Sequence, residues 1–334
     1  MLKYALPASL LLSVSAFAQT QVVTSIKPVS MIVTAIGGDE VKVEQLVNNQ
    51  ASPHDYAMRP SDLRKLDQAD LVVWVGESLE TFLEKPLANL SSKKDIEWMA
   101  LSGTYLREFG EEGHDHEEHD HEAHHDEHEG HDHEAHHDEH ESHDHEEHEH
   151  EAHDEHGHEG HDHTGTDPHV WLDPANAKIL AHNVMEQLRK LDPEPKPEFA
   201  ANYQTFVGAL ETADNNVKAT LAPIKDVPYF VFHEAYGYFE GHYGLNNKGA
   251  VTLSPERKPG AKTVANIRTE IEEHNVACIF SEPQFSPAII ETLIDGTDVK
   301  TAVLDPLGVS LKLSNDSYPA FLEALAGQYA TCLK

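Results

Sequence analysis

The chain is poor in basic residues and in cysteine, and it has no long apolar run. It contains 24 Lys and Arg residues against 59 Asp and Glu, for a formal net charge of −35. This balance excludes a basic nucleic-acid binder, because such proteins neutralise phosphates with clustered Lys and Arg. No apolar run reaches the roughly 18 residues of a membrane-spanning helix. With 334 residues, 39% of them hydrophobic, the chain is long enough for two domains with substantial cores.

The negative charge is concentrated in one internal segment, residues 111–163, called here the His-rich segment. It holds 24 acidic residues, 21 of the 27 His and no Lys or Arg, which leaves 35 acids and 24 bases elsewhere. Residues 119–129 (HDHEAHHDEHE) recur unchanged as residues 131–141. A segment without apolar residues cannot offset its ordering entropy by burial. We therefore expect a disordered loop inserted in a folded lobe.

The His-rich segment twice matches the HExxH pattern of zinc proteases, at residues 121–125 and 133–137. That pattern is meaningful only on an amphipathic helix with a third ligand and an apolar wall, so we discard the protease interpretation. Dense imidazole instead predicts weak binding of divalent metal at overlapping sites, with a merely solvated acidic loop as the alternative. Candidate weak ligands lie near both ends of the segment: His114, His116, His119, His121, His161 and His163.

The first 18 residues have the pattern of a secretory signal peptide. Lys3 supplies a positive start, residues 6–14 are mostly apolar, and residues 16–18 (AFA) fit a small-x-small cleavage site. The alternative is a buried helix. We expect an exported protein whose mature chain begins near Gln19.

Only two cysteines are present, Cys278 and Cys332. Export to an oxidising compartment favours a disulfide between them, and two buried free thiols are the alternative. A structural zinc pair is not expected, because such sites use closely spaced Cys.

Outside the His-rich segment, short apolar runs alternate with helical patterns. The apolar runs predict strands at residues 21–26, 41–47, 71–75, 229–232, 250–253, 277–280 and 301–304. Helices are predicted at residues 61–70, 78–89, 236–243, 262–274, 286–294 and 317–332. A long helical region over residues 174–221 is broken near residues 192–197. Because such alternation is typical of parallel sheets, we expect two α/β lobes, residues 19–173 and 222–334, joined by residues 174–221.

Six histidines lie outside the His-rich segment, and three of them occupy places where α/β proteins bind ligands. His54 and His233 each follow a predicted strand, as does Asp305, and His169 precedes the long helical region. Ligands bind outside the carboxyl ends of strands in α/β sheets. Three imidazoles and one carboxylate are a suitable tetrahedral donor set for Zn²⁺, although each histidine alone could be an ordinary loop residue. The others are assigned to helix faces or ends: His182, His242 and His274.

Several motifs around these residues resemble those of the metal-specific (cluster A-I) solute-binding proteins of ABC importers. They occur in order over nearly the whole mature chain, at residues 52–56 (SPHDY) with 59–62 (RPSD), 167–174 (DPHVWLDP), 232–239 (FHEAYGYF), 281–285 (SEPQF) and 304–308 (LDPLG). The similarity is close to the periplasmic zinc-binding proteins of high-affinity zinc uptake systems. It implies two Rossmann-like lobes bridged by a long helix, with metal held in the cleft between the lobes.

The resemblance also implies that His54, His169 and His233 are ligands and that the two cysteines form a disulfide. One departure concerns the fourth ligand. Some zinc members carry Glu before the first ligand histidine, where this chain has Pro53, which offers no side-chain oxygen. The fourth position then falls to Asp305 or to water. Three imidazoles favour Zn²⁺ as the transported ligand, although their affinity would also admit Cu²⁺ and Ni²⁺.

The expected function is zinc capture in the periplasm and delivery to an ABC-type membrane permease, by a monomer that is not an enzyme. The His-rich segment would act as a low-affinity metal collector or sensor, and a periplasmic accessory zinc chaperone is a candidate second partner. Two alternatives remain open. One is a zinc-dependent hydrolase that uses an open His₃ site with Glu234 or Glu282 as general base. The other is a metal buffer whose lobes only carry the His-rich segment.

Overall fold

A computed structural model describes residues 19–90, 95–109, 165–192, 196–252, 259–286 and 288–334. The expected signal peptide and the His-rich segment, with its six candidate weak ligands, lie outside the described residues. All described residues belong to one compact unit, formed by the chain before residue 111 and after residue 162. Among the described helices, none has the length and apolar character needed to cross a membrane.

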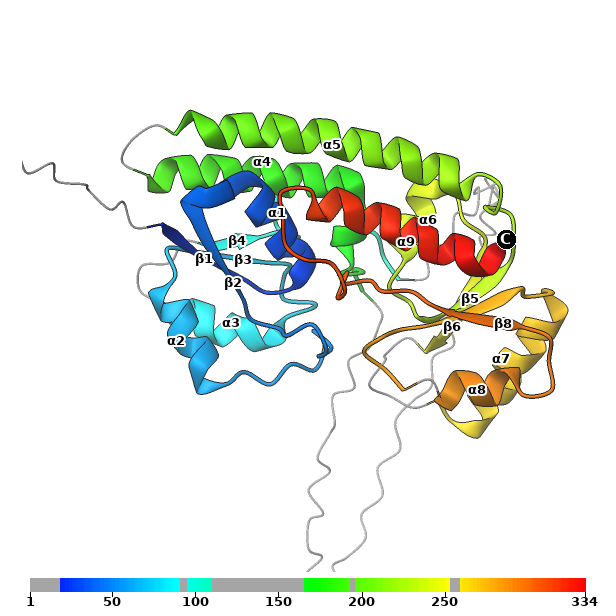
Figure 1. The fold of residues 1–334 in the computed structure, drawn as a ribbon. Helices are drawn as coiled ribbons and strands as arrows, with labels where there is room; N and C mark the ends of the chain where they lie inside the picture. The colour runs from blue at the N-terminus through cyan, green and yellow to red at the C-terminus, as the bar shows by residue number, and fades with distance from the viewer. Residues whose placement is uncertain (1–18, 91–94, 110–164, 193–195, 253–258, 287) are drawn as a thin grey trace, which may run out of the picture. The chain divides into compact units, whose positions relative to one another are not determined.

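Two four-stranded sheets organise the fold, and all pairings between their strands are parallel (Figure 1). The first sheet has the order β2-β1-β3-β4, with β1 at Thr20–Thr24, β2 at Val41–Gln45, β3 at Leu71–Trp74 and β4 at Asp95–Glu97. The second has the order β6-β5-β7-β8, with β5 at Tyr229–His233, β6 at Asn247–Thr252, β7 at Cys278–Ser281 and β8 at Lys300–Val303. The inner strands β3 and β5 are buried along their whole length, as expected where helices cover both faces of a parallel sheet. The predicted α/β class is confirmed.

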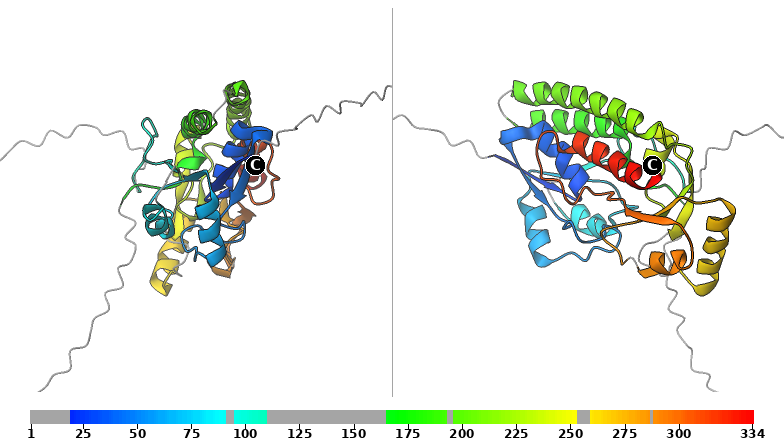
Figure 2. Two further views of the ribbon diagram at one scale, coloured as in Figure 1. Left: turned by 90° about the vertical axis from the view of Figure 1, so that its left-hand side faces the viewer. Right: turned by 45° about the vertical axis from the view of Figure 1, so that its right-hand side comes forward.

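Helices lie on both sides of each sheet (Figures 1 and 2). One side carries α2 (Pro60–Gln68) and α3 (Thr81–Ala88) at the first sheet, and α7 (Ala261–Glu273) and α8 (Ala288–Ile294) at the second. The other side carries α1 (Lys27–Gly37), α4 (Pro174–Leu191), α5 (Pro197–Leu221) and α9 (Ser317–Leu333). The short helix α6 (Gly237–Tyr243) follows β5.

The helical connection between the two sheets consists of α4 and α5, with a break at the predicted place. Helix α5 has 25 residues and is about 38 Å long at about 1.5 Å per residue. It packs against α1, α4 and α9, and therefore contacts helices that belong to both sheets. One continuous apolar core results, running from β1 and α1 to β5 and α9.

Helix α1 is the main element missing from the sequence predictions. Ten of its eleven residues are buried, including the polar residues Lys27 and Ser30. Its apolar residues Val29, Ile32, Val33 and Ile36 nevertheless recur at helical spacing. It also packs very closely, since a Cβ atom on Gly37 would lie 2.0 Å from Cγ2 of Val41. The three-residue strand β4 was not predicted either.

A disulfide joins Cys278, the first residue of β7, to Cys332 near the end of α9, with 6.1 Å between the Cα atoms. The predicted bridge is confirmed, and the alternative of two free thiols is wrong. The bond fastens the last helix to the second sheet.

Candidate metal centre

Three histidines from separate parts of the chain converge at the carboxyl ends of the strands. His54 lies in the loop after β2, His169 precedes the 3-10 turn η2 (Val170–Leu172), and His233 is the last residue of β5. Each offers one ring nitrogen, and the three nitrogens lie within 4.8 Å of one another. In the part of the chain that the structure describes, no other group of His, Cys, Asp and Glu is so arranged.

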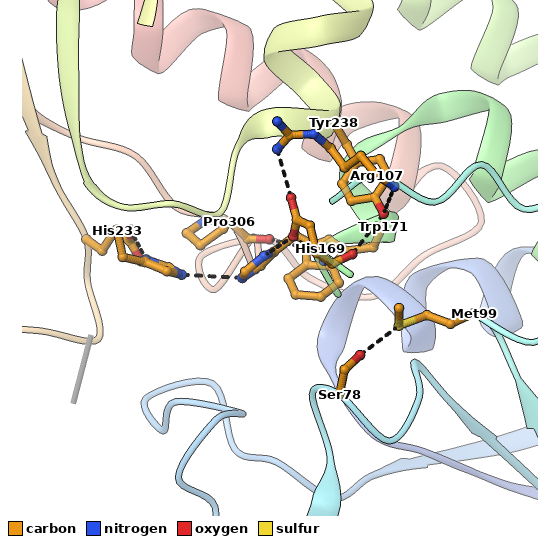
Figure 3. A network of polar contacts seen from close by, with 10 residues as sticks. Ser78, Met99, Arg107, His169, Trp171, His233, Tyr238 and Pro306 are labelled. Carbon is orange, nitrogen blue, oxygen red and sulfur yellow. Dashed lines mark hydrogen bonds and ion pairs between the residues drawn. The ribbon is translucent and has the colours of Figure 1, made fainter. Parts of the chain in front are cut away.

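The spacing of the two most buried rings fits zinc. Nε2 of His233 lies 3.3 Å from Nε2 of His169 (Figure 3). Two nitrogen ligands at about 2.05 Å from a tetrahedral Zn²⁺ would be about 3.3 Å apart. The ring of His54 completes the group, with its centroid 5.3 Å from that of His169 and 5.7 Å from that of His233.

Buried carboxylates orient both of these rings. Nδ1 of His169 lies 2.6 Å from Oδ1 of Asp167, and Nδ1 of His233 lies 2.5 Å from Oε1 of Glu282. When each Nδ1–H donates to its carboxylate, both Nε2 atoms present a lone pair to the shared space. Two lone pairs at this distance repel each other, and a cation between them removes the repulsion. The site is therefore built for a positive ion that accepts nitrogen ligands.

The cavity beside the three rings has a volume of about 20 Å³, close to the room that one water molecule needs. The cavity is lined by the three histidines, by the polar residues Ser52, Glu282 and Gln284, and by five apolar residues: Pro53, Trp171, Phe285, Pro306 and Leu307. Such a cavity has room for one ion beside the three rings.

Local hydrogen bonds hold the loop that carries His54. The backbone N–H of His54 donates to Oγ of Ser52 at 3.2 Å. Further along, the Tyr56 hydroxyl donates to Oδ2 of buried Asp62 at 2.9 Å, and the same oxygen accepts the N–H of Arg59 at the start of α2. The loop is thus anchored where it enters α2.

The turn that carries His169 is joined directly to the second lobe. The indole N–H of Trp171 donates to the carbonyl of Pro306 at 2.8 Å (Figure 3), and the Trp171 ring lies 5.0 Å from that of His169. Asp173 caps α4 by accepting the N–H groups of Ala175 and Asn176. The motif DPHVWLDP therefore serves both as a helix start and as a contact between lobes.

Asp305, the fourth predicted ligand, lies outside the three-histidine group. Its Oδ1 accepts the N–H of Leu307 at 3.1 Å, and its Oδ2 accepts the N–H of Val309 at 2.6 Å. Burial raises the pKa of Asp305, and these hydrogen bonds, with the charge of Lys27, oppose that rise. Lys27 itself donates to the carbonyl of Val309 at 2.8 Å. In this structure the carboxylate stabilises the turn after β8.

Sequence reasoning missed the orienting groups. Asp167 was not singled out, although an acidic residue two positions before a candidate ligand is a usable signal. Glu282 was considered only as a general base, and the structure instead pairs it with His233.

Comparisons with known proteins identify the family. The family described as ZnuA, zinc-uptake complex component A periplasmic, matches residues 22–332 of this chain. The chain belongs to this family. The high-affinity zinc uptake system protein ZnuA of Yersinia pestis is 40% identical over 335 residues, covering 100% of this chain and 98% of its own. The protein of the same name from Haemophilus influenzae is 44% identical over 333 residues, with the same coverage of 100% and 98%.

The fold is also that of a solved ZnuA. A crystal structure of a ZnuA deletion mutant with zinc bound matches with a TM-score of 0.69 and 24% identity, covering 95% of this chain and 99% of that one. The expected two-lobed α/β architecture and the resemblance read from the motifs are both confirmed. The ZnuA relatives named here are transport components, so the hydrolase alternative receives no support.

Proposed function

We propose that this protein captures Zn²⁺ in the periplasm and delivers it to an ABC-type membrane permease. The observation that carries the proposal is the convergence of three imidazoles whose two closest nitrogens are spaced as tetrahedral zinc requires. Imidazole ligands suit zinc, whereas Mg²⁺, Ca²⁺ and Mn²⁺ prefer oxygen. Membership of a zinc-uptake family supports the same assignment.

In this proposal His54, His169 and His233 bind the ion, and a water molecule completes the tetrahedron. Water is favoured over Asp305 because both carboxylate oxygens of Asp305 already accept backbone N–H groups. Pro53, which lines the cavity, has no side-chain donor for this position.

The ligands come from both lobes, and this arrangement provides a route for release. His54 and His169 belong to the first predicted lobe (residues 19–173), and His233 belongs to the second (residues 222–334). A small shift of one lobe would separate His233 from the other two rings and weaken the site. Docking to the permease would supply that shift. A monomer suffices, because a single chain provides all three imidazoles.

The His-rich segment is proposed to collect zinc at low affinity close to this site. Its two flanks pair with each other: the N–H of Phe109 donates to the carbonyl of Gly165 at 3.0 Å, and the N–H of Asp167 donates to that of Arg107 at 2.8 Å. The described flanks of the segment are therefore held together a few residues before His169 in the chain. An accessory zinc chaperone stays a prediction.

Zinc competition with a high-affinity chelator tests the ligand assignment in the full chain, because weak sites do not register against such a competitor. We expect His54→Ala, His169→Ala and His233→Ala each to weaken tight binding at least about tenfold, or ~1.4 kcal/mol. The matched control is His274→Ala, an exposed histidine next to Glu270 at the end of α7, which should leave the affinity unchanged. Wild-type affinity in any of the first three variants would remove that residue from the site.

Deletion of residues 111–163 tests the division between the two kinds of site. The pairing of Phe109 with Gly165 holds the described flanks of the deletion together, so we expect the shortened chain to keep its fold. Calorimetry should find one tight site retained and the weak sites lost. Loss of the tight site as well would favour the metal-buffer alternative.

A further inference from the structure

Arg107 lies at a junction behind the metal centre. Its Nη1 pairs with Oδ2 of fully buried Asp167 at 2.9 Å, while Oδ1 of the same carboxylate contacts Nδ1 of His169 at 2.6 Å (Figure 3). The backbone N–H of His169 also donates to Oδ1 of Asp167, at 3.0 Å. One carboxylate therefore holds the imidazole on one side and the guanidinium on the other, so the position of Arg107 affects the direction in which His169 points.

Arg107 also reaches the second lobe. Its backbone N–H donates to the Tyr238 hydroxyl at 3.0 Å, and that hydroxyl donates to the carbonyl of Asp167 at 2.8 Å. The guanidinium carbon lies 5.9 Å from the centre of the Tyr238 ring. Since Tyr238 is on α6, the helix that follows His233, Arg107 connects the support of one ligand to the element next to another.

The position of the Arg107 guanidinium leaves no room for a side chain at Gly237, the first residue of α6. A Cβ atom added to Gly237 would lie 1.3 Å from Nη1 and 2.1 Å from Cζ of Arg107. The backbone of Gly237 is not in the left-handed region, so its conformation would admit any residue. A side chain at this position would instead enter the space that the Arg107 guanidinium occupies.

We propose that Arg107 is a positioning residue for zinc binding, held in place by the gap at Gly237. The inference rests on the proposed zinc-binding function. The guanidinium compensates the buried charge of Asp167 and fixes the carboxylate against Nδ1 of His169, which keeps Nε2 directed at the metal. Loss of such outer partners typically lowers metal affinity by about 10–100-fold.

The test uses the full-length protein with two readouts: chelator competition for zinc affinity, and the visible absorption of the Co²⁺-loaded protein, which reports ligand geometry. Arg107→Ala should weaken zinc binding about 10–100-fold and change the Co²⁺ spectrum. Arg107→Lys keeps the positive charge but lacks the planar guanidinium group, and should give an intermediate zinc affinity. The matched control is Arg189→Ala on α4, an exposed residue paired with Glu186, which should change neither readout.

Gly237→Ala provides an independent variant, because it displaces the guanidinium while leaving Arg107 in the chain. We expect it to reproduce the Arg107→Ala spectrum in the wild-type background and to add no further loss in the Arg107→Ala background. Such non-additivity is the signature of two residues that act through one contact.

The outcomes separate the two proposals. Absence of tight zinc binding in the wild type would refute the proposed function itself. Tight wild-type binding, with unchanged affinity and Co²⁺ spectrum in Arg107→Ala and Gly237→Ala, would refute the role of Arg107, and so would additive losses in the double variant. If Arg107→Ala does not fold, Gly237→Ala alone decides.

Discussion

A buried carboxyl group in the first lobe should make stability depend on pH in an unusual direction. Glu80, in the loop between β3 and α3, is 0% exposed. Its Oε2 accepts the N–H groups of Val75 at 2.8 Å and Gly76 at 3.0 Å, whereas Oε1 has no hydrogen-bond partner among the described residues. Burial raises the pKa of Glu80 from 4.5 to about 7, because the hydrogen bonds from the two backbone N–H groups offset only part of the lost hydration.

The sign follows from proton binding. In the unfolded chain Glu80 loses its proton near pH 4.5, and in the folded chain near pH 7. Between these values the folded state holds one more proton, so the free energy of unfolding falls as the pH rises. At about 1.4 kcal/mol per pH unit, the accumulated loss is about 3 kcal/mol by pH 8. Glu80→Gln removes this titration while an amide oxygen can still accept from Val75 and Gly76.

Urea unfolding of the metal-free protein at several values between pH 5 and pH 8 measures the effect. The Glu80→Gln variant should gain about 2–3 kcal/mol relative to wild type between these limits. All other titrating groups, including those of the His-rich segment, cancel in the difference. The matched control is Glu84→Gln, exposed on α3, for which we expect no change with pH. A Glu80→Gln effect that is constant across the range would refute the reasoning.

Three further changes test other parts of the account. Glu282→Gln removes the carboxylate next to His233 and should weaken zinc binding about 10–100-fold in chelator competition. An unchanged zinc affinity would show that Glu282 does not orient His233. Replacing both cysteines, Cys278→Ser with Cys332→Ser, should lower the free energy of unfolding by about 4 kcal/mol in denaturant titrations, because the bond closes a loop with a sequence separation of 54. Asp305→Asn should lower the thermal midpoint but change zinc affinity less than about threefold, whereas a tenfold loss would return Asp305 to the ligand set.

Much of the fold could be predicted because its inner strands are continuous apolar runs. The runs LVVW and YFVF are buried on both faces in β3 and β5, and their composition alone distinguishes them from the amphipathic helices around them. Helix α1 could also have been predicted, because Val29, Ile32, Val33 and Ile36 of its sequence KPVSMIVTAIG recur at helical spacing. Its burial could not, since the fold covers even the polar residues Lys27 and Ser30.

The candidate site was predictable only in part, for a related reason. His54 and His233 could be located because the carboxyl ends of parallel strands are places where ligands bind. The orientation of Asp305 depends on backbone N–H groups of Leu307 and Val309, which no motif encodes. The pairing of Arg107 with Asp167 spans the whole His-rich segment, and only the folded chain brings the two residues together.

The most direct test of the central claim is an anomalous difference map at the zinc absorption edge, from crystals of the full chain grown with one equivalent of zinc. The account predicts that the strongest peak lies about 2.0–2.1 Å from one ring nitrogen each of His54, His169 and His233. A strongest peak elsewhere, whether at Asp305 without these histidines or within residues 111–163, would contradict it.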